Sequence, residues 1–223
     1  MLEFVRLARL RVPVRAQCAP DVGRHERPLH VNRTRAIAQA GMIAAVYGAL
    51  TLVTVQFLGF LAWGPVQLRV SEALTVVALF TPAAIPGLAI GSVVANLYTF
   101  VTTGNPLALL DVVFGSLGTL LGAMWMWRFR GRKMLALLGP VLFNALIVPA
   151  YLPLLVKGFG LYRIPFTGID FEGAWIPMYL FGVVAIGLGE AIVVYGLGLP
   201  LSIALERIGL GSRLGMVDHE PRG

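Results

Sequence analysis

The chain has 223 residues, of which 57% are hydrophobic and 13% charged, and its mean hydropathy is +0.80. Soluble domains carry about 25% charged residues, so this composition indicates a membrane protein. The net charge of +7 comes from arginines between apolar segments. Such arginines indicate loop orientation and contact with anionic lipid in preference to nucleic-acid binding. The single Cys18 excludes an intrachain disulfide and a cysteine-rich metal site.

Residues 1–32 form a basic segment that is too charged to cross a membrane and contains no apolar core long enough for a signal peptide. Cys18, His25 and His30 match no zinc-binding spacing. We therefore expect a disordered or surface-lying cytoplasmic tail without a metal site.

The first predicted span covers residues 34–58, with Arg33 and Arg35 at its cytoplasmic end. The next apolar stretch, 70–103, is broken by Pro82 and Pro86, which predicts either two tilted spans or a re-entrant hairpin. A turn follows, in which Asn105 is a predicted N-cap and Pro106 the first helical residue.

Three further spans are predicted at 107–127, 134–156 and 174–205, the last overlong and interrupted by glycines. The loop between the first two is cytoplasmic by the positive-inside rule, because it holds the densest internal basic cluster: Arg128, Arg130, Arg132 and Lys133. The sequence thus predicts an all-α, multi-pass protein of the cell membrane, with six transmembrane helices in 33–208 and both termini cytoplasmic. Residues 209–223 form a second cytoplasmic tail.

Five polar side chains lie inside the apolar stretches: Glu72, Asn96, Asp111, Asn144 and Glu190. In this topology all of them fall between the outer surface and the middle of the membrane. An ionisable group at such depth costs roughly 2.5 to 3.5 kcal/mol, so the cluster predicts a polar ligand that enters from outside. A channel or proton relay would be expected to carry polar groups right across the membrane.

Each polar residue also has a structural alternative. Arg69 and Glu72 can form an ion pair three residues apart, and the helix dipole alone favours Asp111 in a first turn. The two asparagines can simply join helices. Glu190 is the deepest and has no cation within helical reach, which favours a functional role. Three carboxylates against one arginine suit a cationic ligand, or one with adjacent N–H donors such as a guanine edge.

Small residues recur every four positions on the first span, and Gly41 and Ala45 broaden the same face. Such a stripe lets another helix approach closely, either a partner in the membrane or a helix of this chain. Its members are Ala36, Ala40, Ala44 and Gly48.

Several runs closely resemble the queuosine precursor transporter family. They are 64–75 (GPVQLRVSEALT), 80–88 (FTPAAIPGL), 111–119 (DVVFGSLGT), 140–145 (PVLFNA), and Gly189 and Glu190 followed by 196–200 (GLGLP). The resemblance covers residues 35–206 in order and is far more specific than a short motif.

The resemblance implies a substrate-binding S component of an energy-coupling factor transporter. Such a component has six helices and a substrate cup, and its first helix docks through the small-residue stripe onto a transmembrane coupling subunit that two ATPases drive. The implied substrate is a 7-deazaguanine queuosine precursor such as aminomethyl-deazaguanine, or queuine. Glu190, Glu72 and Asp111, beside Arg69, would accept its hydrogen bonds. Asn96, Asn144 and Gln67 would orient it. Trp63 would stack on its ring.

The chain departs from the family pattern at Pro149, Ala150 and Tyr151, where members often carry a glycine and then an acidic residue. Two alternatives remain, an S component for another small cationic or vitamin-like solute and a membrane scaffold without a ligand. An intramembrane enzyme is disfavoured because no histidine lies in any span. We expect neither a cofactor nor an enzymatic activity, and the absence of a Walker motif places ATP hydrolysis on another chain.

Overall fold

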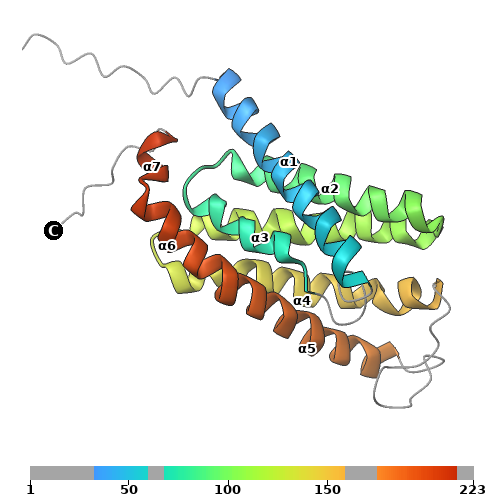
Figure 1. The fold of residues 1–223 in the computed structure, drawn as a ribbon. Helices are drawn as coiled ribbons and strands as arrows, with labels where there is room; N and C mark the ends of the chain where they lie inside the picture. The colour runs from blue at the N-terminus through green and yellow to red at the C-terminus, as the bar shows by residue number, and fades with distance from the viewer. Residues whose placement is uncertain (1–32, 60–67, 159–174, 215–223) are drawn as a thin grey trace, which may run out of the picture. The chain divides into compact units, whose positions relative to one another are not determined.

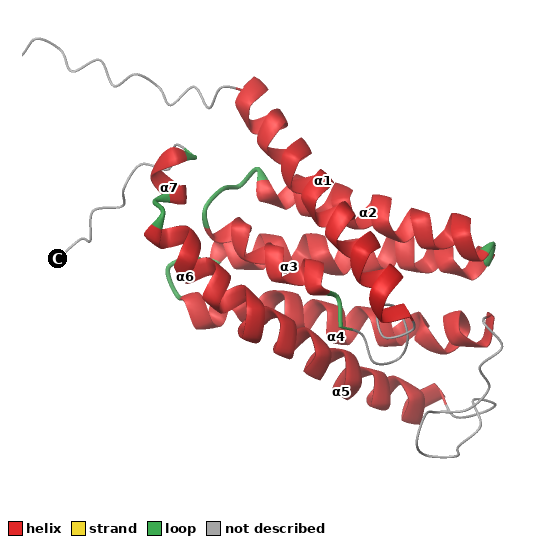
Figure 2. Ribbon diagram, in the orientation of Figure 1, coloured by secondary structure: helices red, strands yellow, loops and turns green. Residues whose placement is uncertain are grey.

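The computed structural model describes residues 33–59, 68–158 and 175–214, and within them all regular structure is helical (Figure 1) (Figure 2). The predicted basic tail, Trp63, Gln67 and residues 215–223 lie outside the described residues. In chain order the elements are α1 (Arg33–Leu58), η2 (Val70–Leu79), α2 (Ala84–Thr103), η3 (Pro106–Ala108), η4 (Asp111–Gly115), α3 (Ser116–Arg128), α4 (Lys133–Gly158), α5 (Trp175–Val193), η5 (Val194–Gly198), α6 (Leu199–Arg207) and α7 (Leu210–Arg213).

Five helical segments are long and apolar enough to cross a membrane, and their bounds agree closely with the predicted spans. They are Arg33–Leu58, Ala84–Thr103, Pro106–Arg128, Lys133–Leu154 and Trp175–Arg207. The predicted all-helical, multi-span fold is confirmed for the described part of the chain. Which side of the membrane each end faces remains a prediction.

The stretch broken by prolines resolves into two unequal helices. Its first half, η2, is a 3₁₀-helix of ten residues, and its second half, α2, has 20 residues. At about 2.0 Å per residue η2 is roughly 20 Å long, shorter than the roughly 30 Å hydrocarbon core. Of the six predicted transmembrane helices, five therefore have full length, and η2 is a shorter apolar helix.

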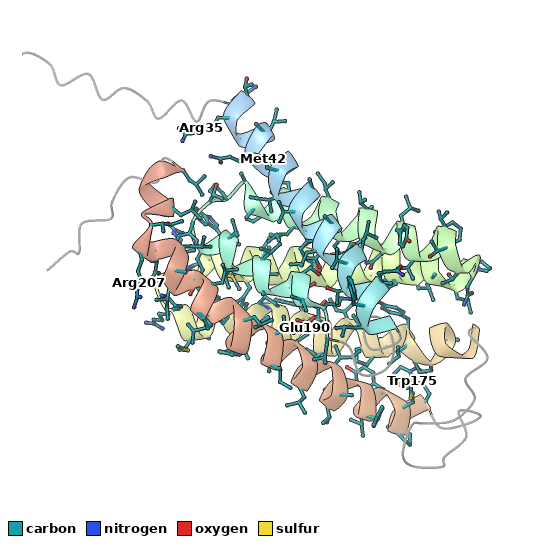
Figure 3. The ribbon with its side chains drawn as sticks, in the orientation of Figure 1. Arg35, Met42, Trp175, Glu190 and Arg207 are labelled. Atoms are coloured by element: carbon teal, nitrogen blue, oxygen red, sulfur yellow. The ribbon has the colours of Figure 1, made fainter. Side chains whose placement is uncertain are left out.

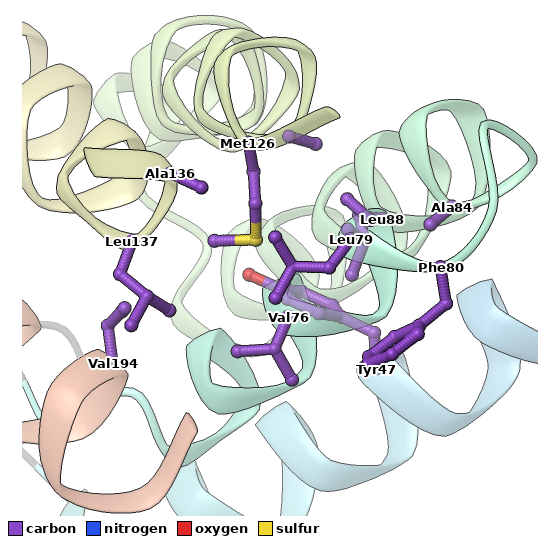
Figure 4. Packing of buried hydrophobic residues seen from close by; sticks show 12 residues of the cluster. Tyr47, Val76, Leu79, Phe80, Ala84, Leu88, Met126, Ala136, Leu137 and Val194 are labelled. Atoms are coloured by element: carbon purple, nitrogen blue, oxygen red, sulfur yellow. The ribbon is translucent and has the colours of Figure 1, made fainter. Parts of the chain in front are cut away.

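The short helix η2 packs at the centre of the bundle. The helices α1 to α5 contact one another in chain order, and η2 contacts each of them as well as η5 and α6. Its Val76 and Leu79 lie in a buried core with Tyr47 of α1, Met126 of α3 and Leu137 of α4 (Figure 4). The 3₁₀ conformation is uncommon over this length, so tertiary packing decides it.

Glycines bring the helices into close contact. A Cβ added at Gly87 or Gly91 of α2 would lie 2.8 Å from a backbone oxygen of α1, and one at Gly122 of α3 would lie 2.8 Å from Cα of Pro140. At Gly182 of α5 the added atom would lie 2.9 Å from Cβ of Pro149. Small residues at helix interfaces are the usual means of association in a membrane, where lipid tails are as apolar as the side chains.

The turn between α2 and η3 forms as predicted. Gly104 ends α2 in the left-handed conformation, with φ 64°, which glycine adopts without steric cost. The Asn105 side chain accepts a hydrogen bond from the Leu107 N–H at 3.0 Å, and Pro106 is the first residue of η3. The N-cap prediction is confirmed, so this turn sets the entry of the Pro106–Arg128 segment that carries Asp111.

Candidate functional site

Six of the eight predicted substrate-binding residues are described, and all six side chains are buried. They are Arg69, Glu72, Asn96, Asp111, Asn144 and Glu190, with exposed fractions between 0% and 6%. They come from six different positions in the fold, and Glu190 lies near the middle of the long Trp175–Arg207 segment (Figure 3). The structure therefore buries polar groups that are spread over about 120 residues of the sequence. The hydrogen bonds of each buried group determine its role.

Arg69, Asp111 and Tyr151 form a fully bonded group, which we call the ion-pair group. Arg69 Nη2 donates to Asp111 Oδ2 at 2.8 Å, and both side chains are 6% exposed. The Tyr151 hydroxyl donates to the other oxygen, Oδ1, at 2.6 Å. Each carboxylate oxygen of Asp111 thus already accepts a bond from the protein, and the charge of Asp111 is balanced by Arg69.

Asn96 of α2 anchors the turn of helix on which Asp111 lies. Its Nδ2 donates to the Asp111 backbone oxygen at 2.9 Å and contacts the Ser116 hydroxyl at 3.3 Å. Asp111 opens the π-helical turn η4, and π turns occur frequently at functional sites. The structural alternative for Asn96, a link between helices, matches this geometry.

Glu72 of η2 is only partly bonded. The Tyr47 hydroxyl of α1 makes a short hydrogen bond to Oε1, and the Thr119 hydroxyl of α3 donates to the same oxygen at 3.3 Å. The other oxygen, Oε2, is buried and has no hydrogen-bond partner among the described residues. An unpaired carboxylate oxygen in the interior is costly, so this atom is available to a ligand.

Glu190 and Asn144 share this property with Glu72, and we call the three residues the open group. Glu190 Oε2 and Asn144 Nδ2 are both buried without a partner among the described residues. A fourth such atom, Asn105 Nδ2, belongs to the turn before η3. Asn144 faces α3, since a Cβ on Gly118 would lie 2.5 Å from its Oδ1, and Gly118 precedes the Thr119 that bonds Glu72.

The open group contains two carboxyl groups, each with one oxygen that has no partner among the described residues. Glu72 and Glu190 lie close enough to interact electrostatically, and the Arg69 charge acts on both. Arg69 is nevertheless bonded directly to Asp111. Two carboxylates and one amide N–H thus remain to be satisfied, which is the complement of a ligand with several N–H donors or a cation and one acceptor.

The sequence prediction missed the hydroxyl groups that support this site: Tyr47, Ser92, Thr119 and Tyr151. Thr119 links Glu72 of η2 to Ser92 of α2, because its hydroxyl also contacts the Ser92 hydroxyl at 3.4 Å. Tyr47 and Thr51 did give a signal, since they lie four residues apart in the first span on the face that meets η2. Hydroxyl residues in apolar helices also bond their own backbone, so such a signal is ambiguous.

The small-residue stripe of α1 packs largely inside the chain. Ala40 and Gly48 are buried, and the backbone oxygens of Ala40 and Ala44 face the glycines of α2. Ala36 and Ala44 are half-buried. The internal-packing alternative therefore describes Ala40 and Gly48, and the exposed small residues on this helix are Ala38, Gly41, Ala45 and Ala49.

Together these features define a multi-pass helical membrane protein with a buried polar site. The family model described as QueT transporter matches residues 37–207, and the chain belongs to this family. The predicted family is thereby confirmed. Because the family consists of transporters, the protein is a membrane transporter component and not an enzyme. Comparison with curated proteins and with solved structures gives no significant match.

Proposed function

We propose that the protein is the substrate-binding membrane subunit of an energy-coupling factor transporter in the cell membrane. Its substrate is a 7-deazaguanine precursor of queuosine, such as aminomethyl-deazaguanine, or queuine. The observation that carries the proposal is the open group, in which Glu72 Oε2, Glu190 Oε2 and Asn144 Nδ2 are buried without partners among the described residues. A membrane scaffold without a ligand does not need such atoms, because the burial of unpartnered polar atoms lowers stability.

A guanine-like edge carries donors and an acceptor of the kinds that these three atoms need. Such an edge presents adjacent N–H donors, which the carboxylates of Glu72 and Glu190 accept, beside a carbonyl oxygen that accepts from Asn144 Nδ2. The two carboxyl groups also suit the ammonium group of an aminomethyl substituent, which favours the charged form of a neighbouring carboxylate. Asp111 takes a positioning role in this arrangement, because it holds Arg69. Trp63 and Gln67 keep their proposed roles of stacking and orientation.

The partners are a transmembrane coupling subunit and two ATPase subunits, which supply the energy that this chain does not generate. The docking surface on α1 is the exposed face with Gly41 and Ala45, next to the half-buried Ala36 and Ala44. Small exposed residues let a partner helix approach closely in the membrane. The two buried residues of the stripe, Ala40 and Gly48, support this surface from behind by packing on α2.

Calorimetric titration of the purified protein in detergent tests the substrate class. Aminomethyl-deazaguanine, queuine and guanine are titrated, with riboflavin as the unrelated control. We expect submicromolar binding of one deazaguanine and at least tenfold weaker binding in Glu190→Gln, because one charge-assisted hydrogen bond contributes about 1.5 to 3 kcal/mol.

Glu206→Gln is the matched control. Glu206 forms an exposed ion pair with Lys133 at 2.8 Å, so this variant removes a carboxylate from the surface and should bind as the wild type does. Binding of another small cation in place of the deazaguanines would keep the transporter class and overturn the substrate. If no solute binds and Glu190→Gln assembles and functions unchanged, the scaffold alternative holds.

A further inference from the structure

A groove with a volume of about 430 Å³ lies beside α3 at the end where this helix meets α4. Its walls are almost wholly apolar and come from α2, α3 and α4 and from the turn that joins α3 to α4. Apart from Trp127 and Arg128, the residues that line it are Ile85, Leu121, Met124, Trp125, Phe129 and Phe143. The groove contains none of the open group or the ion-pair group, so it is a separate feature of the molecule.

Close packing and a hydrogen bond hold Trp125, one of the two tryptophans that line this groove, in place. A Cβ on Gly139 of α4 would lie 2.5 Å from the indole ring, so only glycine there lets the ring pack this closely. The indole N–H donates to the Leu135 backbone oxygen at 2.9 Å. Its ring centroid lies 4.4 Å from that of Phe129 and 6.1 Å from that of Phe143. The aromatic wall is therefore preformed.

One arginine lines the groove, and a second stacks on Trp127, which also lines it. Arg128 lines it, with its guanidinium 5.5 Å from the centroid of Phe129, and the guanidinium of Arg130 lies 4.1 Å from the centroid of Trp127. Neither arginine forms an ion pair with a carboxylate in the described part of the chain. Lys133, by contrast, is balanced by Glu206. The two arginine charges are thus available to an anion.

The groove lies where two candidate spans end, because one runs from Pro106 to Arg128 and the next begins at Lys133. Tryptophan and arginine at such a boundary occupy the headgroup level, and the apolar walls face the acyl chains. The positive-inside rule predicts that this end is cytoplasmic, the side on which anionic lipids concentrate.

We propose that this groove binds an anionic phospholipid, with one acyl chain along the apolar walls and the phosphate at Arg128 and Arg130. Charge complementarity favours this occupant over a zwitterionic lipid. A second apolar groove, of about 340 Å³ and lined by α5 residues such as Phe181 and Leu188 together with Leu68, contains no charged residue. It should accept acyl chains without a preference for the headgroup.

Tryptophan quenching by brominated lipids tests the proposal. The protein carries Trp63→Phe and Trp175→Phe, so that only Trp125 and Trp127 report, and it is reconstituted in nanodiscs of phosphatidylcholine. Phosphatidylglycerol or phosphatidylcholine with brominated acyl chains is then added in steps. We expect phosphatidylglycerol to reach half-maximal quenching at about tenfold lower mole fraction, since two basic residues contribute to its binding.

The double variant Arg128→Gln and Arg130→Gln should abolish this preference, whereas Arg207→Gln, which removes an exposed arginine of α6 away from the groove, should keep it. Equal quenching by both lipids in the unmodified groove would overturn the proposal, whether or not the double variant folds. A preference that survives the double variant would overturn it too, because the charge would then act from elsewhere.

Discussion

The ion-pair group and the open group lie in the same buried interior but are built in opposite ways. In the first, both Asp111 carboxylate oxygens accept bonds from Arg69 and Tyr151. In the second, Glu72, Asn144 and Glu190 each keep one polar atom without a partner among the described residues. A satisfied network stabilises one conformation, whereas unsatisfied atoms reduce stability until a ligand bonds to them. In the proposed function, the ion-pair group therefore supports the site and the open group recognises the substrate.

Asp111→Asn should give the largest effect on stability. It removes the charge that balances Arg69 while keeping the shape of the side chain, and breaking a buried ion pair costs about 3 to 5 kcal/mol. Thermal unfolding in detergent, followed by tryptophan fluorescence, should show a marked decrease in Tm or a loss of folded protein. Glu206→Gln, which breaks the exposed ion pair with Lys133, is the control and should unfold close to the wild type. An unchanged Tm in Asp111→Asn would contradict the supporting role of the ion-pair group.

Glu72→Gln and Glu190→Gln should show the reverse pattern. Each replaces a buried carboxyl group that the protein does not fully satisfy, so stability in the absence of ligand should be unchanged or higher. Affinity for the deazaguanine should fall by at least about tenfold, corresponding to the 1.5 to 3 kcal/mol of a charge-assisted bond. Measuring Tm and Kd on the same samples checks both parts. A large loss of stability in either variant would instead show that these carboxylates stabilise the fold, as the ion-pair group does.

Gly118→Ala should act on the open group without changing any polar residue. The added Cβ would lie 2.5 Å from Asn144 Oδ1, so the amide must shift, and overpacking of this kind costs about 1 to 3 kcal/mol. Calorimetry should show weaker binding of the deazaguanine. Gly196→Ala in η5, where the added atom meets nothing within 4 Å, is the control. Equal affinity in both variants would remove Asn144 from the recognition surface.

Tyr151→Phe and Tyr47→Phe should give the smallest effects and sharpen the division between the groups. Tyr151→Phe removes one bond to Asp111, and we expect a loss of stability of about 1 kcal/mol with little change in affinity. Tyr47→Phe removes the bond to Glu72 Oε1, which should affect binding more than stability because Glu72 loses its orientation. Comparing Tm and Kd for the pair tests this, and the idea fails if both variants behave alike.

The sequence identified the buried polar residues because a charge inside an apolar stretch is visible without a structure. It placed Glu72, Asp111 and Glu190 in one site, and the structure buries all three. It could not predict that Arg69 pairs with Asp111, 42 residues away, because the i, i+3 alternative with Glu72 is indistinguishable by spacing. It also could not decide whether the small-residue stripe packs against a helix of this chain or docks a partner helix, because both contacts need the same small residues.

The sequence by itself determined the membrane class, the positions of the long helices and the family, because apolar length, cap residues and motif runs are local properties of the chain. Tertiary structure alone decided that η2 is a short 3₁₀-helix at the centre of the bundle, and which polar atoms are satisfied. Whether an atom is satisfied depends on donors and acceptors contributed by other helices. Tyr47, Thr119 and Tyr151 reach the carboxylates only after the helices have packed.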